Sequence, residues 1–194
     1  MGTTEQTERH YLDAIEVSVQ KVADHFRREP ASFLYEADLR GLLFTRIFDY
    51  LSDSVRTWKP VDDCWAGMAA GPALLVNPAK TEYPKPEPFD VAVLVPEMCA
   101  DKNAWNQNVR VGVEIKLWQA DGTGGNCNFD KKKLERYGAK AQAEGRRFTG
   151  LCLVFCHLRN DKRLGMWGGG AAKVEGHGGL AIPEQGVRTF VITP

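Results

Sequence analysis

The sequence predicts a single domain of the α/β class. The run from Val109 to Trp118 alternates between apolar and other residues, which is the period of a β-strand. Apolar residues recur at helical spacing from Leu34 to Leu51, and a second helix is expected from about Asn128 to Glu144. A chain of 194 residues with 43% hydrophobic residues is long enough for one well-packed domain, and nothing in it suggests a second.

The elements are expected in the order helix, three strands, helix, strand. After the helix at Leu34–Leu51, the strands are Ala73–Asn77, Phe89–Val95 and Val109–Trp118, followed by the helix at Asn128–Glu144 and a strand at Leu151–Phe155. An additional amphipathic helix, from about Glu8 to Arg28, precedes them. We expect this helix to pack on the core or on a second subunit of a homodimer.

Two acidic side chains are predicted to meet at one edge of the sheet. Phe89 and Val109 are expected on the apolar faces of their strands, so Asp90 and Glu114 project to the opposite side, away from the core. If the two strands pair as an antiparallel hairpin, Asp90 lies beside Glu114. Two carboxylates about 4 Å apart repel by roughly 4 kcal/mol at an effective dielectric constant near 20, so a cation is expected between them. Lys116 supplies part of that charge.

With this order of elements, residues 34–158 resemble the PD-(D/E)xK nuclease superfamily, which has the restriction-endonuclease-like fold. The resemblance implies an αβββαβ core, with a central mixed sheet flanked by helices and an extra N-terminal helix. In that family an acid ends or interrupts the second core strand, and Asp90 matches it. An acid-x-lysine triplet lies on the third strand, and Glu114 and Lys116 match it. A glutamate often comes from the first helix, where Glu36 stands.

The context of the triplet carries this resemblance, because an acid-x-lysine triplet is expected by chance about once in a chain of this length. A second match, Asp130-Lys131-Lys132, lies in helical sequence. The residue before Asp90 is Phe89, where the family has a proline, although Pro88 is adjacent. That proline carries no chemistry, so the departure weakens the match only slightly.

Each candidate residue also has a purely structural interpretation. Glu114 and Lys116 could form a solvent-exposed pair on a sheet, which contributes only about 0 to 1 kcal/mol. Asp90 could cap the start of a strand. Glu36 could simply favour the helix N-terminus through the helix dipole.

The resemblance implies magnesium-dependent hydrolysis of phosphodiester bonds, with DNA as the expected substrate in restriction, repair or recombination. Magnesium, for which manganese can substitute, is expected to be held by Asp90, Glu114 and the backbone carbonyl of Ile115. Glu36 completes or adjusts this site, and Lys116 orients the attacking water or stabilises charge on the phosphorus. A noncatalytic nucleic-acid-binding or assembly protein on the same scaffold is the alternative.

The formal net charge is zero, so a nucleic-acid enzyme with this sequence needs a local basic surface. Lys132, Arg136 and Lys140 recur every four residues and form a stripe on the predicted helix. This stripe is the candidate nucleic-acid-binding surface. A solvated helix face explains the same spacing equally well.

The cysteines and the N-terminus indicate the compartment. The five cysteines form neither a CxxC pair nor an even disulfide framework, which suits a reducing environment. The N-terminus has no apolar signal-peptide core, and no stretch reaches the length of a membrane span. The expected location is therefore the cytoplasm, without membrane association.

Overall fold

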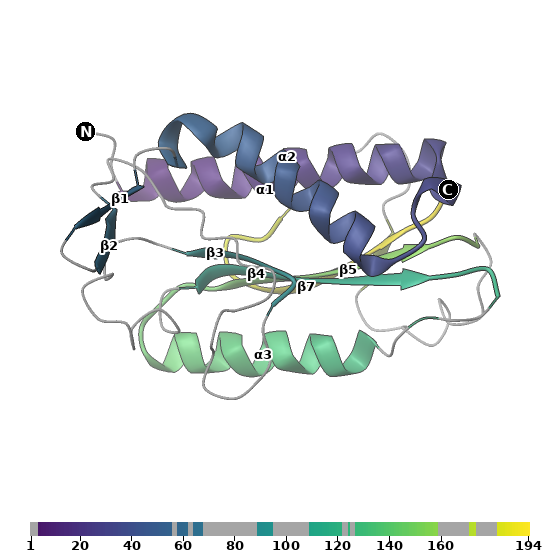
Figure 1. Ribbon diagram of the computed structural model, residues 1–194. Coiled ribbons are helices and arrows are strands. Elements are labelled where there is room, and N and C mark those ends of the chain that lie inside the picture. Colours follow the sequence, from purple (N-terminus) through teal and green to yellow (C-terminus); the bar gives the residue numbers. More distant parts are fainter. Residues whose placement is uncertain are drawn as a thin grey trace.

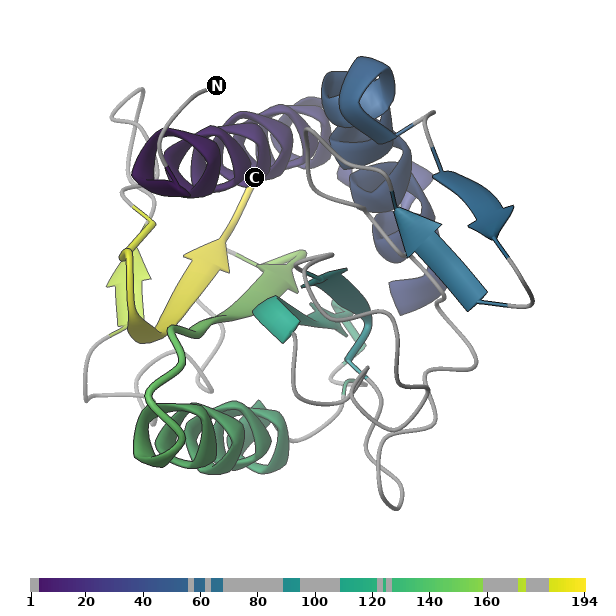
Figure 2. The same ribbon diagram turned by 90° about the vertical axis from the view of Figure 1, so that its left-hand side faces the viewer.

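The structure is a computed structural model, and it describes residues 4–55, 58–61, 64–67, 89–94, 109–121, 124, 127–158, 171–173 and 182–194. These residues form three layers, with two helices on one face of a central sheet and one helix on the other (Figures 1 and 2). The helices are α1 (Thr4–Arg28), α2 (Glu36–Val55) and α3 (Cys127–Ala143). The α/β class predicted from the sequence is confirmed.

The central sheet is mixed and has five strands in the described part of the chain, in the order β3-β4-β5-β7-β6. They are β3 (Val91–Leu94), β4 (Val109–Trp118), β5 (Thr149–Cys156), β7 (Gly186–Ile192) and β6 (Ala171–Lys173). β3 runs antiparallel to β4, and the other pairs are parallel. Because β4 and β5 are parallel neighbours, α3 serves as the crossover between them.

A separate antiparallel hairpin and one short helix complete the described elements. The hairpin pairs β1 (Trp58–Val61) with β2 (Cys64–Gly67) and follows closely after the end of α2. A 3-10 turn, η1 (Pro30–Ser32), separates α1 from α2. Neither strand of the hairpin was predicted. The strand expected at 73–77 lies outside the described residues.

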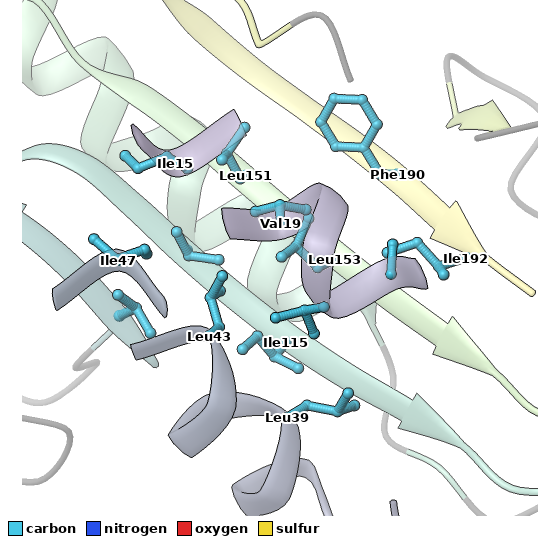
Figure 3. Close-up of a cluster of buried hydrophobic side chains, with 14 of the residues drawn as sticks. Ile15, Val19, Leu39, Leu43, Ile47, Ile115, Leu151, Leu153, Phe190 and Ile192 are labelled. Carbon is cyan, nitrogen blue, oxygen red and sulfur yellow. The ribbon is translucent and has the colours of Figure 1, made fainter. Parts of the chain in front are cut away.

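The first hydrophobic core lies between the sheet and the pair α1 and α2 (Figure 3). It forms because β4 and β5 turn every second side chain toward these helices, Ile115 and Leu153 among them. Val19 from α1 and Leu43 from α2 fill the space above them. The N-terminal helix α1 therefore packs on the core, which is one of the two positions expected for it.

The second core lies under α3 and depends on close approach of the helix to the sheet. Phe148 is buried there beside Tyr137, with 4.7 Å between their ring centroids. A Cβ atom on Gly150 would lie 3.0 Å from the side chain of Val187 and 3.1 Å from that of Leu134. Glycine at position 150 thus lets α3 lie directly on the strands.

Two expected side-chain directions are wrong, for local reasons. Phe89 lies in the core under α3, because the chain bends at Asp90 before β3 begins. Val109 also lies in that core, because the register between β3 and β4 shifts between Val93 and Leu94. An irregularity of this kind breaks the alternation of a strand.

The expectation that both acids point away from the core is also wrong for Glu114. It does project to the side opposite α1 and α2, but α3 covers that side. Only 3% of Glu114 is exposed.

The described helices include none with the length and apolar character needed to cross a bilayer.

Candidate functional site

The candidate site lies where β4 extends past the start of β3. β3 pairs with β4 only up to Val113, so the following residues of β4 have no β3 partner. Asp90, immediately before β3, takes the place of a strand partner for Ile115 of β4. Its Oδ2 accepts a 2.8 Å hydrogen bond from the backbone N–H of Ile115. Its Oδ1 lies 3.4 Å from Nη1 of Arg40 on α2. The Asp90 carboxylate therefore holds the edge of β4 and is paired with a cation.

Glu36 binds the next backbone N–H along the same edge of β4, that of Leu117. Its Oε1 accepts a hydrogen bond of 3.4 Å from the backbone N–H of Leu117. Glu36 begins α2, but the capping contacts come from Asp38, whose Oδ2 accepts hydrogen bonds from the N–H groups of Leu34 and Tyr35. Because Asp38 occupies the capping role, the side chain of Glu36 reaches the sheet.

Lys116 joins two acidic side chains that come from opposite layers. Its Nζ lies 3.4 Å from Oε2 of Glu36 on α2 and 3.1 Å from Oδ2 of Asp130 on α3. Burial alone lowers the pKa of Lys116, but the carboxylates of Glu36, Asp130 and Asp90 outweigh it and raise the pKa above its ordinary value. The lysine is therefore a permanent cation at neutral pH.

Glu114 pairs with a lysine that the sequence analysis did not select. Nζ of Lys133, on α3, lies 2.5 Å from Oε1 of Glu114, and both side chains are buried. The same ammonium lies 5.4 Å from the ring centroid of Phe89. Burial raises the pKa of Glu114 to about 8, although Lys133 acts in the opposite direction.

All four predicted catalytic side chains come together around residues 114–117 of β4. Asp90 and Glu36 contact the backbone of this segment, and Glu114 and Lys116 belong to it. The described cluster contains four carboxylates (Glu36, Asp90, Glu114, Asp130) and three cations (Arg40, Lys116, Lys133). With every group ionised it carries one negative charge, and protonation of Glu114 would make it neutral.

Asp90 and the carbonyl oxygen of Ile115, two of the groups expected to hold magnesium, lie on the same edge of β4. In a β-strand the N–H and C=O of one residue point to the same neighbour. The carbonyl of Ile115 therefore lies on the edge where Asp90 binds its N–H. Oε1 of Glu114 and Oδ2 of Asp130 are buried and, within the described structure, have no hydrogen-bond partner of regular geometry. Carboxylate and carbonyl oxygens are the ligands that suit magnesium.

The described residues contain no three acidic, histidine or cysteine side chains arranged to hold a metal ion. The predicted set has only two carboxylates, Asp90 and Glu114, together with a carbonyl. Arg40 and Lys133 already pair with those carboxylates. The donor atoms fit magnesium in kind, and binding would require the two side-chain cations to give way.

Three members of the cluster were missed by the sequence analysis: Arg40, Asp130 and Lys133. Asp130 was seen only as part of a chance triplet in helical sequence. One available signal was its position, since Asp130 shares the buried face of α3 with Leu134 and Ala141. A charged residue on the apolar face of an amphipathic helix needs a partner across the interface. Arg40 gave no such signal, because its contact spans 50 residues.

The predicted basic stripe is on the surface of the molecule. Lys132, Arg136 and Lys140 are exposed, whereas the buried residues of α3 face the sheet. Nζ of Lys140 lies 4.0 Å from a carboxylate oxygen of Glu144, a weak surface pair. The stripe is thus accessible to a ligand, and its role in binding nucleic acid stays a prediction.

Comparison of the chain with protein-family models, with curated proteins and with solved structures found no match.

Proposed function

We propose that the chain is a magnesium-dependent nuclease with a restriction-endonuclease-like core, acting on DNA. The observation that supports this proposal most is the arrangement at the edge of β4. Asp90 and Glu36 bind the backbone N–H groups of Ile115 and Leu117, on either side of Lys116. Charged side chains from different elements thus gather around the acid-x-lysine triplet.

In this proposal Asp90, Glu114 and the carbonyl of Ile115 hold the metal ion. The ion would lower the pKa of a bound water and offset the charge of the phosphate. Glu36 and Asp130 hold the ammonium of Lys116 in place from two sides. Because the pKa of Lys116 is raised, this side chain donates hydrogen bonds and positive charge and does not accept a proton.

A noncatalytic nucleic-acid-binding or assembly protein is the second candidate, and one observation favours it. Each carboxylate of the cluster already contacts a cation from the chain itself. A cluster balanced in this way can hold α2, α3 and the sheet together without a metal ion.

Cleavage of supercoiled and linear DNA, with magnesium or with a chelator, tests the proposal. We expect cleavage only with magnesium. Lys116→Ala should lower the turnover on the order of 100-fold or more, because a charge directed at the reacting phosphate is lost. DNA affinity without metal should change little. Lys131→Ala is the matched control, because Lys131 is one residue from Asp130 but pairs with Glu135 along α3.

Two outcomes would contradict the proposal. Unchanged turnover in Lys116→Ala would remove this lysine from the mechanism. DNA binding without cleavage, under every divalent metal and substrate form, would favour the noncatalytic protein. Thermal unfolding of both variants shows whether a loss of activity comes from a loss of fold.

A further inference from the structure

An exposed aromatic ring lies at one end of the basic stripe of α3. Phe129 is 56% exposed, so its ring is accessible to a ligand. It precedes Lys132 by three residues, Arg136 by seven and Lys140 by eleven, so all four share one face of the helix. We call these four residues the aromatic-basic face.

This face begins beside the charged cluster. Phe129 lies one turn before Lys133, whose ammonium contacts Glu114, and it is next to Asp130, which contacts Lys116. Figure 1 shows the start of α3 at the same end of the molecule as the end of β4. The three cations then follow the helix away from the cluster.

The chemistry of the face fits a strand with unpaired bases. Cations track the phosphates, and an exposed ring stacks on a base. A duplex keeps its bases stacked on one another, so it offers the phosphates but no free base face. Lys132 and Arg136 are both exposed and lie in the middle of the face, between Phe129 and Lys140.

We infer that the aromatic-basic face binds a single-stranded stretch of DNA, with a base stacked on Phe129 and the phosphates along Lys132 and Arg136. This inference rests on the proposed function, since it names the form of the substrate that reaches the cluster. It predicts that the chain prefers single-stranded DNA or duplexes with unpaired regions.

Binding of the full chain to a labelled oligothymidylate and to a duplex of equal length, both in a chelator, tests this inference. Phe129→Ala should weaken binding to the single strand by about 5- to 100-fold, the range for loss of one base–aromatic stack. Binding to the duplex should change less than about twofold. Phe129→Trp should retain the single-strand affinity, because the larger ring also stacks.

Tyr50→Ala is the matched control, because Tyr50 is also an exposed aromatic residue. It lies 14 residues after Glu36 on α2, about 21 Å along the helix axis. We expect no change in binding for this variant. Since Phe129 is exposed, its replacement should leave the thermal unfolding temperature nearly unchanged.

Equal affinity of Phe129→Ala and the unmodified chain for the single strand would overturn the inference. An equal loss on the duplex would overturn it too, because the ring would then not read unpaired bases. If the chain cleaves duplex DNA with magnesium but shows no such dependence on Phe129, the inference alone fails. If binding depends on Phe129 and no cleavage occurs, the proposed nuclease activity fails and the binding face stands.

Discussion

The buried carboxyl of Glu114 makes the candidate site sensitive to pH. Its pKa is raised from an ordinary value of 4.5 to about 8, because burial disfavours the ionised form. Between these two values the folded protein keeps a proton that the unfolded chain releases. Stability therefore falls as the pH rises through this window. Below about pH 4.5 the stabilisation from this retained proton is fully present, and above about pH 8 it is lost.

We predict that this pH dependence disappears in Glu114→Gln, since glutamine does not titrate. Chemical unfolding from pH 5 to pH 9, in a chelator, should show the unmodified chain losing stability relative to the variant, on the order of a few kcal/mol in total. Glu135→Gln is the control, because Glu135 is a half-exposed carboxylate on α3, the helix that covers Glu114. Parallel curves for the unmodified chain and Glu114→Gln would mean that Glu114 has an ordinary pKa.

The residues of the cluster divide into those that local pattern predicts and those that only tertiary structure supplies. Strand phase placed Asp90, Glu114 and Lys116 on one side of the sheet, and the resemblance to the nuclease family added Glu36. Arg40 and Lys133, which pair with Asp90 and Glu114, could not be selected from local pattern. The contact of Arg40 with Asp90, for example, spans 50 residues. The burial of Glu114 was missed for the same reason: strand alternation does not say what covers each face.

Among the elements, those with a strong period were predicted well and short irregular ones were not. The predicted bounds of β4 match the observed Val109–Trp118, because ten alternating residues leave little choice. β7 (Gly186–Ile192) was missed, although it lies beside β5 and contributes Phe190 to the first core. Its sequence follows a glycine-rich stretch, so the expected core ended too early, at 158.

Two glycines on different elements allow a test of the packing under α3. Gly150→Ala should lower the free energy of unfolding by about 1 to 3 kcal/mol, because a Cβ atom would meet Val187 and Leu134 within 3.1 Å. Gly41→Ala should instead raise it by about 0.5 to 1 kcal/mol. Gly41 lies inside α2, where nothing lies within 4 Å of a new Cβ atom and alanine favours the helix.

Chemical unfolding of the two glycine variants gives both values. Effects of the same sign would contradict the packing described for the second core. A stable Gly150→Ala would mean that α3 can move away from the sheet at little cost.

For the whole molecule, the balance of charge limits where nucleic acid can bind. The net charge is zero, so attraction to phosphate must come from a local surface. The stripe of Lys132, Arg136 and Lys140 is exposed on α3, while α1 and α2 cover the opposite side of the sheet. The two faces of the molecule should therefore differ in their contribution to binding.

Replacing Lys132 and Arg136 with glutamine should reduce the slope of log affinity against log salt concentration by about 1 to 2 units. The control is Lys21→Gln with Arg28→Gln, which removes the same charge from exposed positions of α1. DNA affinity over a range of salt concentrations gives the slope. An unchanged slope in the α3 variant would place the binding surface elsewhere.

The overhang of β4 beyond β3 has a consequence for self-association. An open strand edge with unpaired amides is a template onto which another chain can add a strand, and this is a common origin of aggregation. Here the amides of Ile115 and Leu117 already donate hydrogen bonds to Asp90 and Glu36, so they are not available to an approaching strand. Two of the residues proposed for catalysis thus also block strand addition at this sheet edge. Neutral substitutions at Asp90 or Glu36 should therefore lower solubility as well as activity.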